Sequence, residues 1–318
     1  MKEPYCLIDV SATLPPIEES IDAARWKGRV LSIHSPIPEH LSYFIFQPTA
    51  PLTGVAPVVS IHGWTRNVAE HAFRLASYAE ARGVAVIAPL FSRKMHKHYQ
   101  RLEVRKGEQC PADALEHLLQ DVKQRFAIDT RTINLFGFSG GAQFAHRFAM
   151  MRPELVNRLA LMAAGWFTMP DPAISYPLGL AQSEILADRK LDLQSFLECP
   201  TRVFVGERDV RRDDSLNTGK QIDLIQGRNR VERAQHWVAA MQQAANAHHV
   251  NADIELQIIE KAKHNFGTCI QKHQLGELIF DWLTPVQQGE KHEKIDVMGK
   301  RAFSFNRFTG LFTRYNCR

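Results

Sequence analysis

A serine flanked by glycines is the residue with the clearest chemical potential in this sequence. Ser139 is the centre of Gly137-Phe138-Ser139-Gly140-Gly141, a GxSxG motif between the strand-like run TINLFGF and the helix-like run GAQFAHRFAM. Small flanking residues let a strand and a helix approach closely at a sharp turn, and the helix N-terminus favours a developing negative charge. The motif therefore predicts a nucleophile elbow with Ser139 as the nucleophile. An ordinary glycine-rich turn is the alternative that the motif alone leaves open.

A second turn could supply the hydrogen-bond donors that acyl transfer needs. His62-Gly63-Trp64 follows the apolar, strand-like run APVVSI. A tetrahedral oxyanion is stabilised by two backbone N–H groups, one after the nucleophile and one in the loop after an earlier strand. The sequence thus predicts an oxyanion hole formed by the amides of Gly140 and Trp64. We interpret His62 as a structural residue that braces this loop.

An acid and a histidine follow two later strand-like runs. The run TRVFVGE leads into Asp209, and DIELQIIE is followed by a loop that contains His264. Loops at the carboxyl ends of parallel strands meet at one edge of a sheet, where α/β proteins place their chemistry. The order serine, acid, histidine predicts a triad in which His264 takes the proton of Ser139 and Asp209 orients the imidazole. A solvated acid and a surface histidine are the alternatives.

Strand-like and helix-like segments alternate through most of the chain. Repeated strand–helix–strand order with continuous apolar strands predicts an α/β protein whose mostly parallel central sheet is covered by helices on both faces. The predicted strands are 41–46, 56–61, 84–88, 132–138, 159–163, 201–205 and 254–259. The predicted helices are 67–81, 113–126, 142–151, 233–248 and 267–283.

These motifs resemble a known family. The stretch FGFSGGAQFAHRFAMMRPELVNRLALMAAGW, together with His62-Gly63, the run VGERD and His264, is similar to the α/β-hydrolase superfamily of serine esterases, in particular its polyhydroxybutyrate depolymerase and feruloyl esterase-like branch. The resemblance spans about residues 40–285. It implies the α/β-hydrolase fold and a carboxylic ester hydrolase that acts on a small-molecule ester through an acyl-enzyme, with no cofactor and no metal. A serine peptidase, a thioesterase or a non-catalytic binding protein on the same fold are the alternatives.

Two segments are candidates for substrate binding. The segment after the strand at 84–88 carries Arg93, Lys94 and Lys97, whose charge predicts an electropositive mouth that attracts an anionic substrate. A solvated loop is the alternative. Trp166 and Phe167 begin a segment at about 165–200 that lies where related enzymes often carry a cap. Their side chains could line an acyl pocket or form a small satellite core.

The end of the chain differs in composition from the rest. Residues 286–318 hold seven Lys or Arg against three Asp or Glu, and so carry most of the net charge of +5. We expect an α/β-hydrolase domain at 1–285, with the cap-like insertion, followed by a basic, aromatic tail at 286–318. Packing of this tail on its own domain, or on a neighbouring subunit of a homo-oligomer, is favoured over binding to nucleic acid or an anionic membrane.

The remaining composition indicates a cytoplasmic enzyme. No apolar run approaches the ~18–20 residues that span a bilayer, and Glu3 and Asp9 interrupt the N-terminal stretch where a signal peptide is apolar. The five cysteines lack metal-binding or disulfide spacing. We therefore expect reduced thiols, no transmembrane segment, no metal site and no nucleic-acid partner.

Overall fold

The structure is a computed structural model that describes residues 7–9, 26–35, 37, 40–104 and 109–285. The strands in these residues are β1 (Leu7–Asp9), β2 (Val30–Ile33), β3 (Ser42–Phe46), β4 (Val58–Ile61), β5 (Val86–Leu90), β6 (Ile133–Phe138), β7 (Val156–Met162), β8 (Thr201–Gly206) and β9 (Ile254–Ile259). The α-helices are α1 (Val68–Ala81), α2 (Pro111–Phe126), α3 (Gly140–Met151), α4 (Leu193–Leu197), α5 (Lys220–Gln226), α6 (Arg230–Ala247), α7 (Phe266–Lys272) and α8 (Leu275–Leu283). Short 3₁₀ turns are η2 (Tyr99–Arg101) and η3 (Pro153–Leu155).

The strands form one sheet in the order β1-β2-β3-β5-β4-β6-β7-β8-β9. β3 pairs antiparallel with β2 and with β5. All pairs from β5 across to β9 are parallel, so the carboxyl ends of these six strands lie at one edge. The prediction of a mostly parallel sheet is therefore confirmed, and this edge is where the loops that carry the candidate residues begin.

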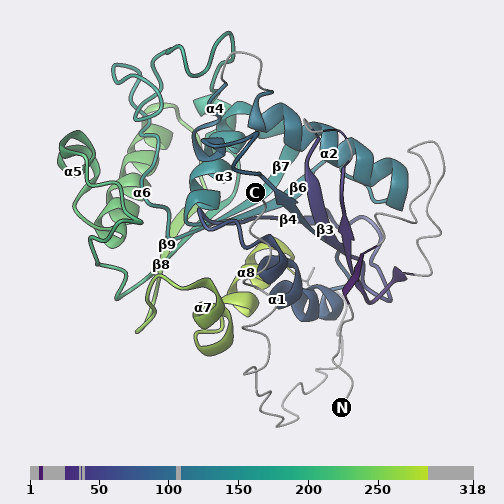
Figure 1. Ribbon diagram of the computed structural model, residues 1–318. Helices are drawn as coiled ribbons and strands as arrows, with labels where there is room; N and C mark the ends of the chain where they lie inside the picture. Colours follow the sequence, from purple (N-terminus) through teal and green to yellow (C-terminus); the bar gives the residue numbers. More distant parts are fainter. Residues whose placement is uncertain (1–6, 10–25, 36, 38–39, 105–108, 286–318) are drawn as a thin grey trace. The chain divides into compact units, whose positions relative to one another are not determined.

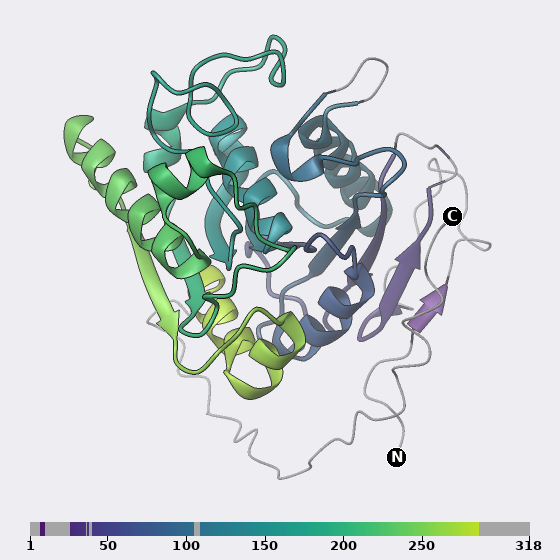
Figure 2. The same ribbon diagram turned by 60° about the vertical axis from the view of Figure 1, so that its left-hand side comes forward.

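Helices cover both faces of the sheet (Figures 1 and 2). α1, α7 and α8 pack on one face around one apolar cluster. α2, α3, α4 and α6 pack on the other face around a second cluster. The strand β6 serves both clusters because successive side chains point to opposite faces: Ile133 and Leu135 enter one core, whereas Phe136 and Phe138 enter the other. This explains why the strand is apolar without alternation.

Some elements differ from the prediction. The single helix predicted at 267–283 is wrong, because the chain forms α7 and α8 with Gln274 between them in a left-handed conformation (φ 55°) that an α-helix cannot include. The short strands β1 and β2 and the short helices α4 and α5 were not predicted. Elements of three to seven residues carry too few periodic positions to stand out from a loop.

The segment predicted to be cap-like contains little regular structure. Between β7 and α4 the chain runs through turns with a single isolated bridge between Ser175 and Ala181. The predicted tail at 286–318 lies outside the described residues. Among the described helices, none combines the length and apolarity that crossing a membrane requires.

Two glycines allow α3 to lie directly against the sheet. A Cβ atom on Gly141 would lie 2.1 Å from the carbonyl oxygen of Ile61, at the end of β4. A Cβ atom on Gly137 would lie 2.3 Å from the carbonyl oxygen of Gly141. Both neighbours are backbone atoms that cannot rotate away, so the turn between β6 and α3 accepts only glycine at these positions.

We predict that Gly141→Ala lowers the free energy of unfolding by about 3 kcal/mol or more, because the helix must move off the sheet. Urea denaturation followed by circular dichroism measures this loss. Gly54→Ala is the control, since nothing lies within 4 Å of its Cβ position and only the positive φ of 77° is strained, which costs about 1–2 kcal/mol. Equal losses in the two variants would contradict the steric explanation.

Candidate active site

Ser139 occupies a strained turn between β6 and α3. Its backbone has φ 56° and ψ −113°, a combination that residues other than glycine rarely adopt. Two backbone hydrogen bonds hold it there: its N–H donates to the carbonyl of Met162 at 2.8 Å, and its carbonyl accepts from the N–H of Gln143 at 3.2 Å. Ser139 is 8% exposed. The hydroxyl is thus fixed at the carboxyl edge of the sheet.

Three side chains from separate loops form a continuous chain of hydrogen bonds. His264 Nε2 lies 3.0 Å from Ser139 Oγ, and His264 Nδ1 lies 2.7 Å from Asp209 Oδ2. A carboxylate only accepts, so Nδ1 carries the proton and Nε2 is left to accept one from the serine hydroxyl. The ring of Phe138 stacks on the imidazole at 5.0 Å between centroids. The structure brings together the three residues of the predicted triad.

The loops that carry the acid and the histidine are joined by their backbones. Asp209 lies in the turn after β8, and its N–H donates to the carbonyl of Gly206 at 2.9 Å. The N–H of Arg208 donates to the carbonyl of Ala262, two residues before His264, at 2.9 Å. This contact fixes the two loops relative to each other and explains how residues 55 positions apart meet.

The loop with the second amide of the predicted oxyanion hole lies against Gly140. A Cβ atom on Gly140 would lie 3.3 Å from the backbone nitrogen of Trp64 and 3.1 Å from the hydroxyl of Tyr99. Within the described part of the chain, neither amide donates a hydrogen bond to another backbone or side-chain group. Trp64 is 45% exposed. Two free N–H groups next to a nucleophile could stabilise a developing oxyanion.

Comparisons with known proteins bear on the fold. No family model matches the sequence, and no curated protein matches it. Among solved structures, the chain is similar to poly(aspartic acid) hydrolase-1 from Sphingomonas sp. KT-1, with a TM-score of 0.67, 22% identity, and coverage of 78% of this chain and 97% of that one. It is also similar to a poly(3-hydroxybutyrate) depolymerase from Bordetella parapertussis, with a TM-score of 0.65, 24% identity, and coverage of 76% and 84%. It is similar as well to an S-formylglutathione hydrolase from Agrobacterium tumefaciens, with a TM-score of 0.51, 17% identity, and coverage of 80% of this chain and 94% of that one.

The chain has the α/β-hydrolase fold. Strands β2 to β9 form eight neighbouring strands of the sheet, and β1 adds a ninth at one edge. The resemblance that the sequence motifs indicated is thereby confirmed at the level of the fold.

His62 braces the loop that follows β4 in this α/β-hydrolase fold. Its Nδ1 donates to the carbonyl of Gly63 at 2.9 Å, and its Nε2 accepts from the N–H of Phe91 at 3.1 Å. The hydroxyl of Tyr99 donates to the carbonyl of His62 at 2.7 Å. Burial lowers the pKa of His62 to about 4, so the ring is neutral at physiological pH. These contacts agree with the structural role predicted for it.

Arg66 joins the same loop to the segment after β5, which sequence analysis did not reveal. It has a left-handed backbone (φ 59°), and its guanidinium donates to the carbonyls of Phe91 at 2.7 Å, Trp64 at 3.1 Å and Lys97 at 3.1 Å. The guanidinium of Arg66 donates hydrogen bonds only to backbone carbonyls. No sequence pattern distinguishes such an arginine from one that is exposed to solvent. It fixes the loop that holds one predicted oxyanion donor.

Arg230 is a second residue that sequence analysis missed. It is the first residue of α6, and its Nη1 donates to Asp209 Oδ1 at 3.1 Å, on the carboxylate oxygen that His264 does not use. Its Nη2 donates to the carbonyl and hydroxyl of Ser215 at 3.0 and 2.8 Å. The side chains of Arg230 and Asp209 are each 1% exposed. The Asn229 cap signals that a helix begins here, but nothing in the sequence shows that Arg230 points inward.

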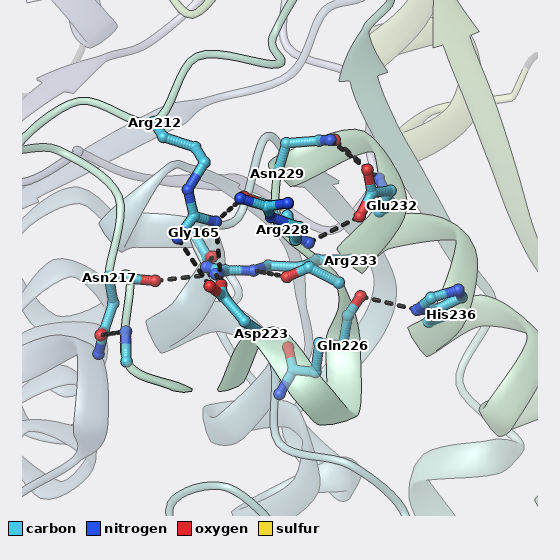
Figure 3. A network of polar contacts seen from close by, with 12 residues as sticks. Gly165, Arg212, Asn217, Asp223, Gln226, Arg228, Asn229, Glu232, Arg233 and His236 are labelled. Carbon is cyan, nitrogen blue, oxygen red and sulfur yellow. Dashed lines mark hydrogen bonds and ion pairs between the residues drawn. The ribbon is translucent and has the colours of Figure 1, made fainter. Parts of the chain in front are cut away.

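Arg233, one turn further along α6, organises a separate network (Figure 3). It binds Asp223 Oδ1 at 2.8 Å and the carbonyl of Asn217 at 2.8 Å, and it also donates to the carbonyl of Gly165. Arg212 reaches the other oxygen of Asp223 at 2.6 Å. The network ties α5 and the loop before it to the start of the predicted cap-like insertion.

The basic residues predicted to form an electropositive mouth are exposed. Arg93, Lys94 and Lys97 all lie at the surface of the segment after β5. The backbone of this segment reaches the oxyanion loop through the carbonyls of Phe91 and Lys97, which Arg66 binds. Their side chains therefore project from a segment that contacts the site, and a role in attracting substrate stays a prediction.

The two aromatic residues predicted to line an acyl pocket have different surroundings. Trp166 is 6% exposed, and its ring carries the guanidinium of Arg147 at 4.3 Å from the centroid. Phe167 is completely buried and stacks on Trp237 at 4.7 Å. Phe167 therefore belongs to the main apolar core, whereas Trp166 belongs to a small separate cluster with Leu178 and Ile222.

No group of three or more His, Cys, Asp or Glu side chains that could hold a metal ion occurs in the described residues. Cys110, Cys199 and Cys269 are buried thiols. Burial raises the pKa of the Cys199 thiol to about 12 and that of Cys269 to about 11, which keeps both protonated and unreactive.

We predict that acidification destabilises the protein through its buried histidines. The pKa of His62 is about 4 in the folded chain, below the value of about 6.5 for an unfolded histidine. The unfolded chain therefore binds more protons between these pH values, so the free energy of unfolding falls as the pH drops from about 6.5 towards 4, by about 3 kcal/mol for this residue. Burial lowers the pKa of His71 and His146 in the same direction.

Urea denaturation at pH 7.5 and pH 4.5 measures this dependence. His62→Gln should be less stable than the wild type at pH 7.5 but lose less stability on acidification. His248→Gln, at an exposed position, is the matched control and should keep the wild-type dependence. An unchanged pH dependence in His62→Gln would refute the assignment.

Proposed function

We propose that this protein is a serine hydrolase that cleaves carboxylic esters through an acyl-enzyme intermediate. The observation that carries the proposal is the unbroken hydrogen-bond chain from Asp209 through His264 to Ser139, beside two amides without an acceptor in the described residues. Each of these groups has a distinct task in acyl transfer, and their combination has no evident structural purpose.

The geometry supports the following sequence of steps. Ser139 Oγ attacks the ester carbonyl while His264 Nε2 removes its proton, and the carbonyl oxygen becomes an oxyanion that accepts from the amides of Gly140 and Trp64. Asp209 stabilises the resulting imidazolium through Nδ1. The imidazolium then protonates the departing alcohol, which leaves Ser139 acylated. Water repeats the cycle: His264 removes its proton, the hydroxide attacks the acyl group, and Ser139 recovers its proton as the acid departs.

The alternatives differ in how well they fit the site. A thioesterase or a serine peptidase would use the same groups, and neither is favoured by a particular contact. A non-catalytic binding protein would not need Ser139 in a strained backbone conformation with its hydroxyl on His264. The similar solved structures are named as hydrolases and a depolymerase, which supports a hydrolase over a binding protein. We propose further that residues 165–200 form a cap-like insertion in a domain that spans 1–285.

We predict that Ser139→Ala and His264→Ala each lower turnover of a short-chain aryl ester by about four orders of magnitude, because nucleophile and base act as one unit. A fluorophosphonate probe should form an adduct that mass spectrometry locates on the peptide containing Ser139. Ser195→Ala, at a half-buried position in α4, is the control and should retain turnover and labelling. A correctly folded Ser139→Ala protein with wild-type turnover would overturn the proposal.

We predict that Arg230 acts through Asp209 as a positioning residue. Arg230→Met leaves one carboxylate oxygen without its partner and frees the acid to rotate, so kcat should fall by about 10- to 100-fold with little change in KM. Arg230→Lys should restore part of kcat because it retains the charge.

Arg233→Met is the matched control for this prediction. Arg233 is buried to the same extent on the same helix but binds Asp223 instead of Asp209. This variant should lose stability, measured by thermal denaturation, and keep kcat within about threefold of the wild type. Equal losses of kcat in the Arg230 and Arg233 variants would show that Arg230 has no particular role in positioning.

A further inference from the structure

One buried arginine on the nucleophile helix has no acidic partner. Arg147 lies on α3 with no exposed surface, and its Nε donates to Thr168 Oγ1 at 2.9 Å. Its Nη1 donates to the carbonyls of Gln100 and Gln143. In the residues that the structure describes, no carboxylate pairs with this guanidinium, and its buried Nη2 has no hydrogen-bond partner.

A second arginine faces the same indole ring. The guanidinium of Arg101, at the end of η2, lies 5.9 Å from the centroid of Trp166, and that of Arg147 lies 4.3 Å from it. Arg101 Nε is also buried without a hydrogen-bond partner, and no ion pair joins Arg101 to an acid within the described ranges. Two cations thus share one aromatic ring, and each has an unused N–H group.

This arrangement is unfavourable unless an anion completes it. Buried charges in proteins are normally paired, because removing an ion from water costs several kcal/mol. Burial lowers the pKa of Arg147 to about 10, because removal from water disfavours its charged form. The contacts to Thr168 and Gln100 explain why Arg147 is held in place. They leave Nη2 of Arg147 and Nε of Arg101 buried without a hydrogen-bond acceptor in the described residues.

The arginine pair lies close to the nucleophile. Gln143 and Arg147 are four residues apart on one face of α3, the helix whose N-cap is Ser139, and helical side chains lean towards the N-terminus. The contact of Arg147 Nη1 with the carbonyl of Gln143 shows this lean and places the guanidinium beside Gln143, in the first turn of α3. Gln143 is 9% exposed and Trp166 is 6% exposed. Ser139 is exposed to a similar small extent, at 8%.

Neighbouring segments connect the pair to the site. Tyr99 and Arg101 belong to the same 3₁₀ turn, and the hydroxyl of Tyr99 lies 3.1 Å from the Cβ position of Gly140. Gly165, which precedes Trp166, lies against Gln143, whose Nε2 would be 2.9 Å from a Cβ at Gly165. The elements that carry the two arginines and the indole thus meet beside the nucleophile elbow.

We propose that Arg101 and Arg147, on the ring of Trp166, bind a carboxylate carried by the ester substrate. This inference rests on the proposed ester hydrolase activity and names its substrate class: esters with an anionic group several bonds from the scissile carbonyl. The subsite differs from the exposed Arg93, Lys94 and Lys97, whose long-range attraction salt would screen. Contacts at the buried guanidinium of Arg147 and the buried Nε of Arg101 persist in salt because no solvent separates the charges.

Paired substrates test this subsite. Monomethyl succinate, glutarate and adipate are compared with uncharged esters of matched shape, such as methyl 4-methylpentanoate for the succinate. We expect kcat/KM to favour the charged member of at least one pair by about tenfold or more, with the preference retained in 1 M salt. The pair with the largest preference indicates, by its chain length, the distance from Ser139 to the arginines. Equal kcat/KM within all pairs overturns the proposal.

Two single-charge variants locate the effect. Arg101→Met should reduce the charged-to-neutral preference about tenfold, and it is the safer variant because its guanidinium makes no hydrogen bond within the described residues. Lys123→Met removes the same charge from an exposed position in α2 and should keep the preference. A preference that is lost in Lys123→Met or in 1 M salt, but kept in Arg101→Met, reflects surface attraction and overturns the subsite.

The failure of this inference can be told from failure of the proposed function. A protein that hydrolyses a neutral aryl ester and labels at Ser139, but shows no preference for charged esters, retains the function and lacks the subsite. A protein that neither hydrolyses any ester nor labels at Ser139 refutes both. Arg147→Lys provides an independent check, since it keeps the charge but not the forked geometry, and should reduce the preference while circular dichroism shows an unchanged fold.

Discussion

The close approach of α3 to the sheet is the constraint on which the rest of the site depends. A carbonyl at the end of β4 occupies the space that a Cβ on Gly141 would need, and Gly137 meets the helix backbone in the same way. With the helix this close, the residue between β6 and α3 has no room for an ordinary turn and takes a left-handed conformation. Ser139 is thereby lifted to the edge of the sheet, where the loops after β8 and β9 reach it. The strain is offset by the burial of β6 and α3 between two apolar cores.

Buried arginines give this domain much of its local order, and they fall into two kinds. Arg230 and Arg233 are paired with Asp209 and Asp223, so their charges are compensated and they hold one loop each. Arg147 is surrounded by carbonyls, a hydroxyl and an indole, and has no such compensation. A buried arginine that is paired with an acid can have a purely structural role. An unpaired one adjacent to a nucleophile is more readily explained by a ligand.

The sequence predicted best what local chemistry determines. The elbow around Ser139 requires small residues at fixed offsets, and parallel strands require that Asp209 and His264 follow strand ends, so both could be recognised by position. Arg230, Arg66 and Arg147 could not be, because their roles depend on which way a side chain points after the chain has folded. The break between α7 and α8 was also missed, since the apolar spacing continues across Gln274 and only its backbone reveals the turn. Phe167 and Trp166 are neighbours of similar character, yet packing against Trp237 buries only the first completely.

The order of the strands has a consequence for how the protein is made. Ser139 and His264 are 125 residues apart, and the histidine follows β9, the last strand of the described sheet and one of its edges. During synthesis, β2 to β7 and the turn that carries Ser139 leave the ribosome long before His264, which we propose as the base. A nascent or truncated chain can therefore hold a well-formed elbow that is inert. Under the proposed mechanism, Ser139 becomes reactive only after β9 has been added, so its reactivity would report that all strands of the described sheet have assembled.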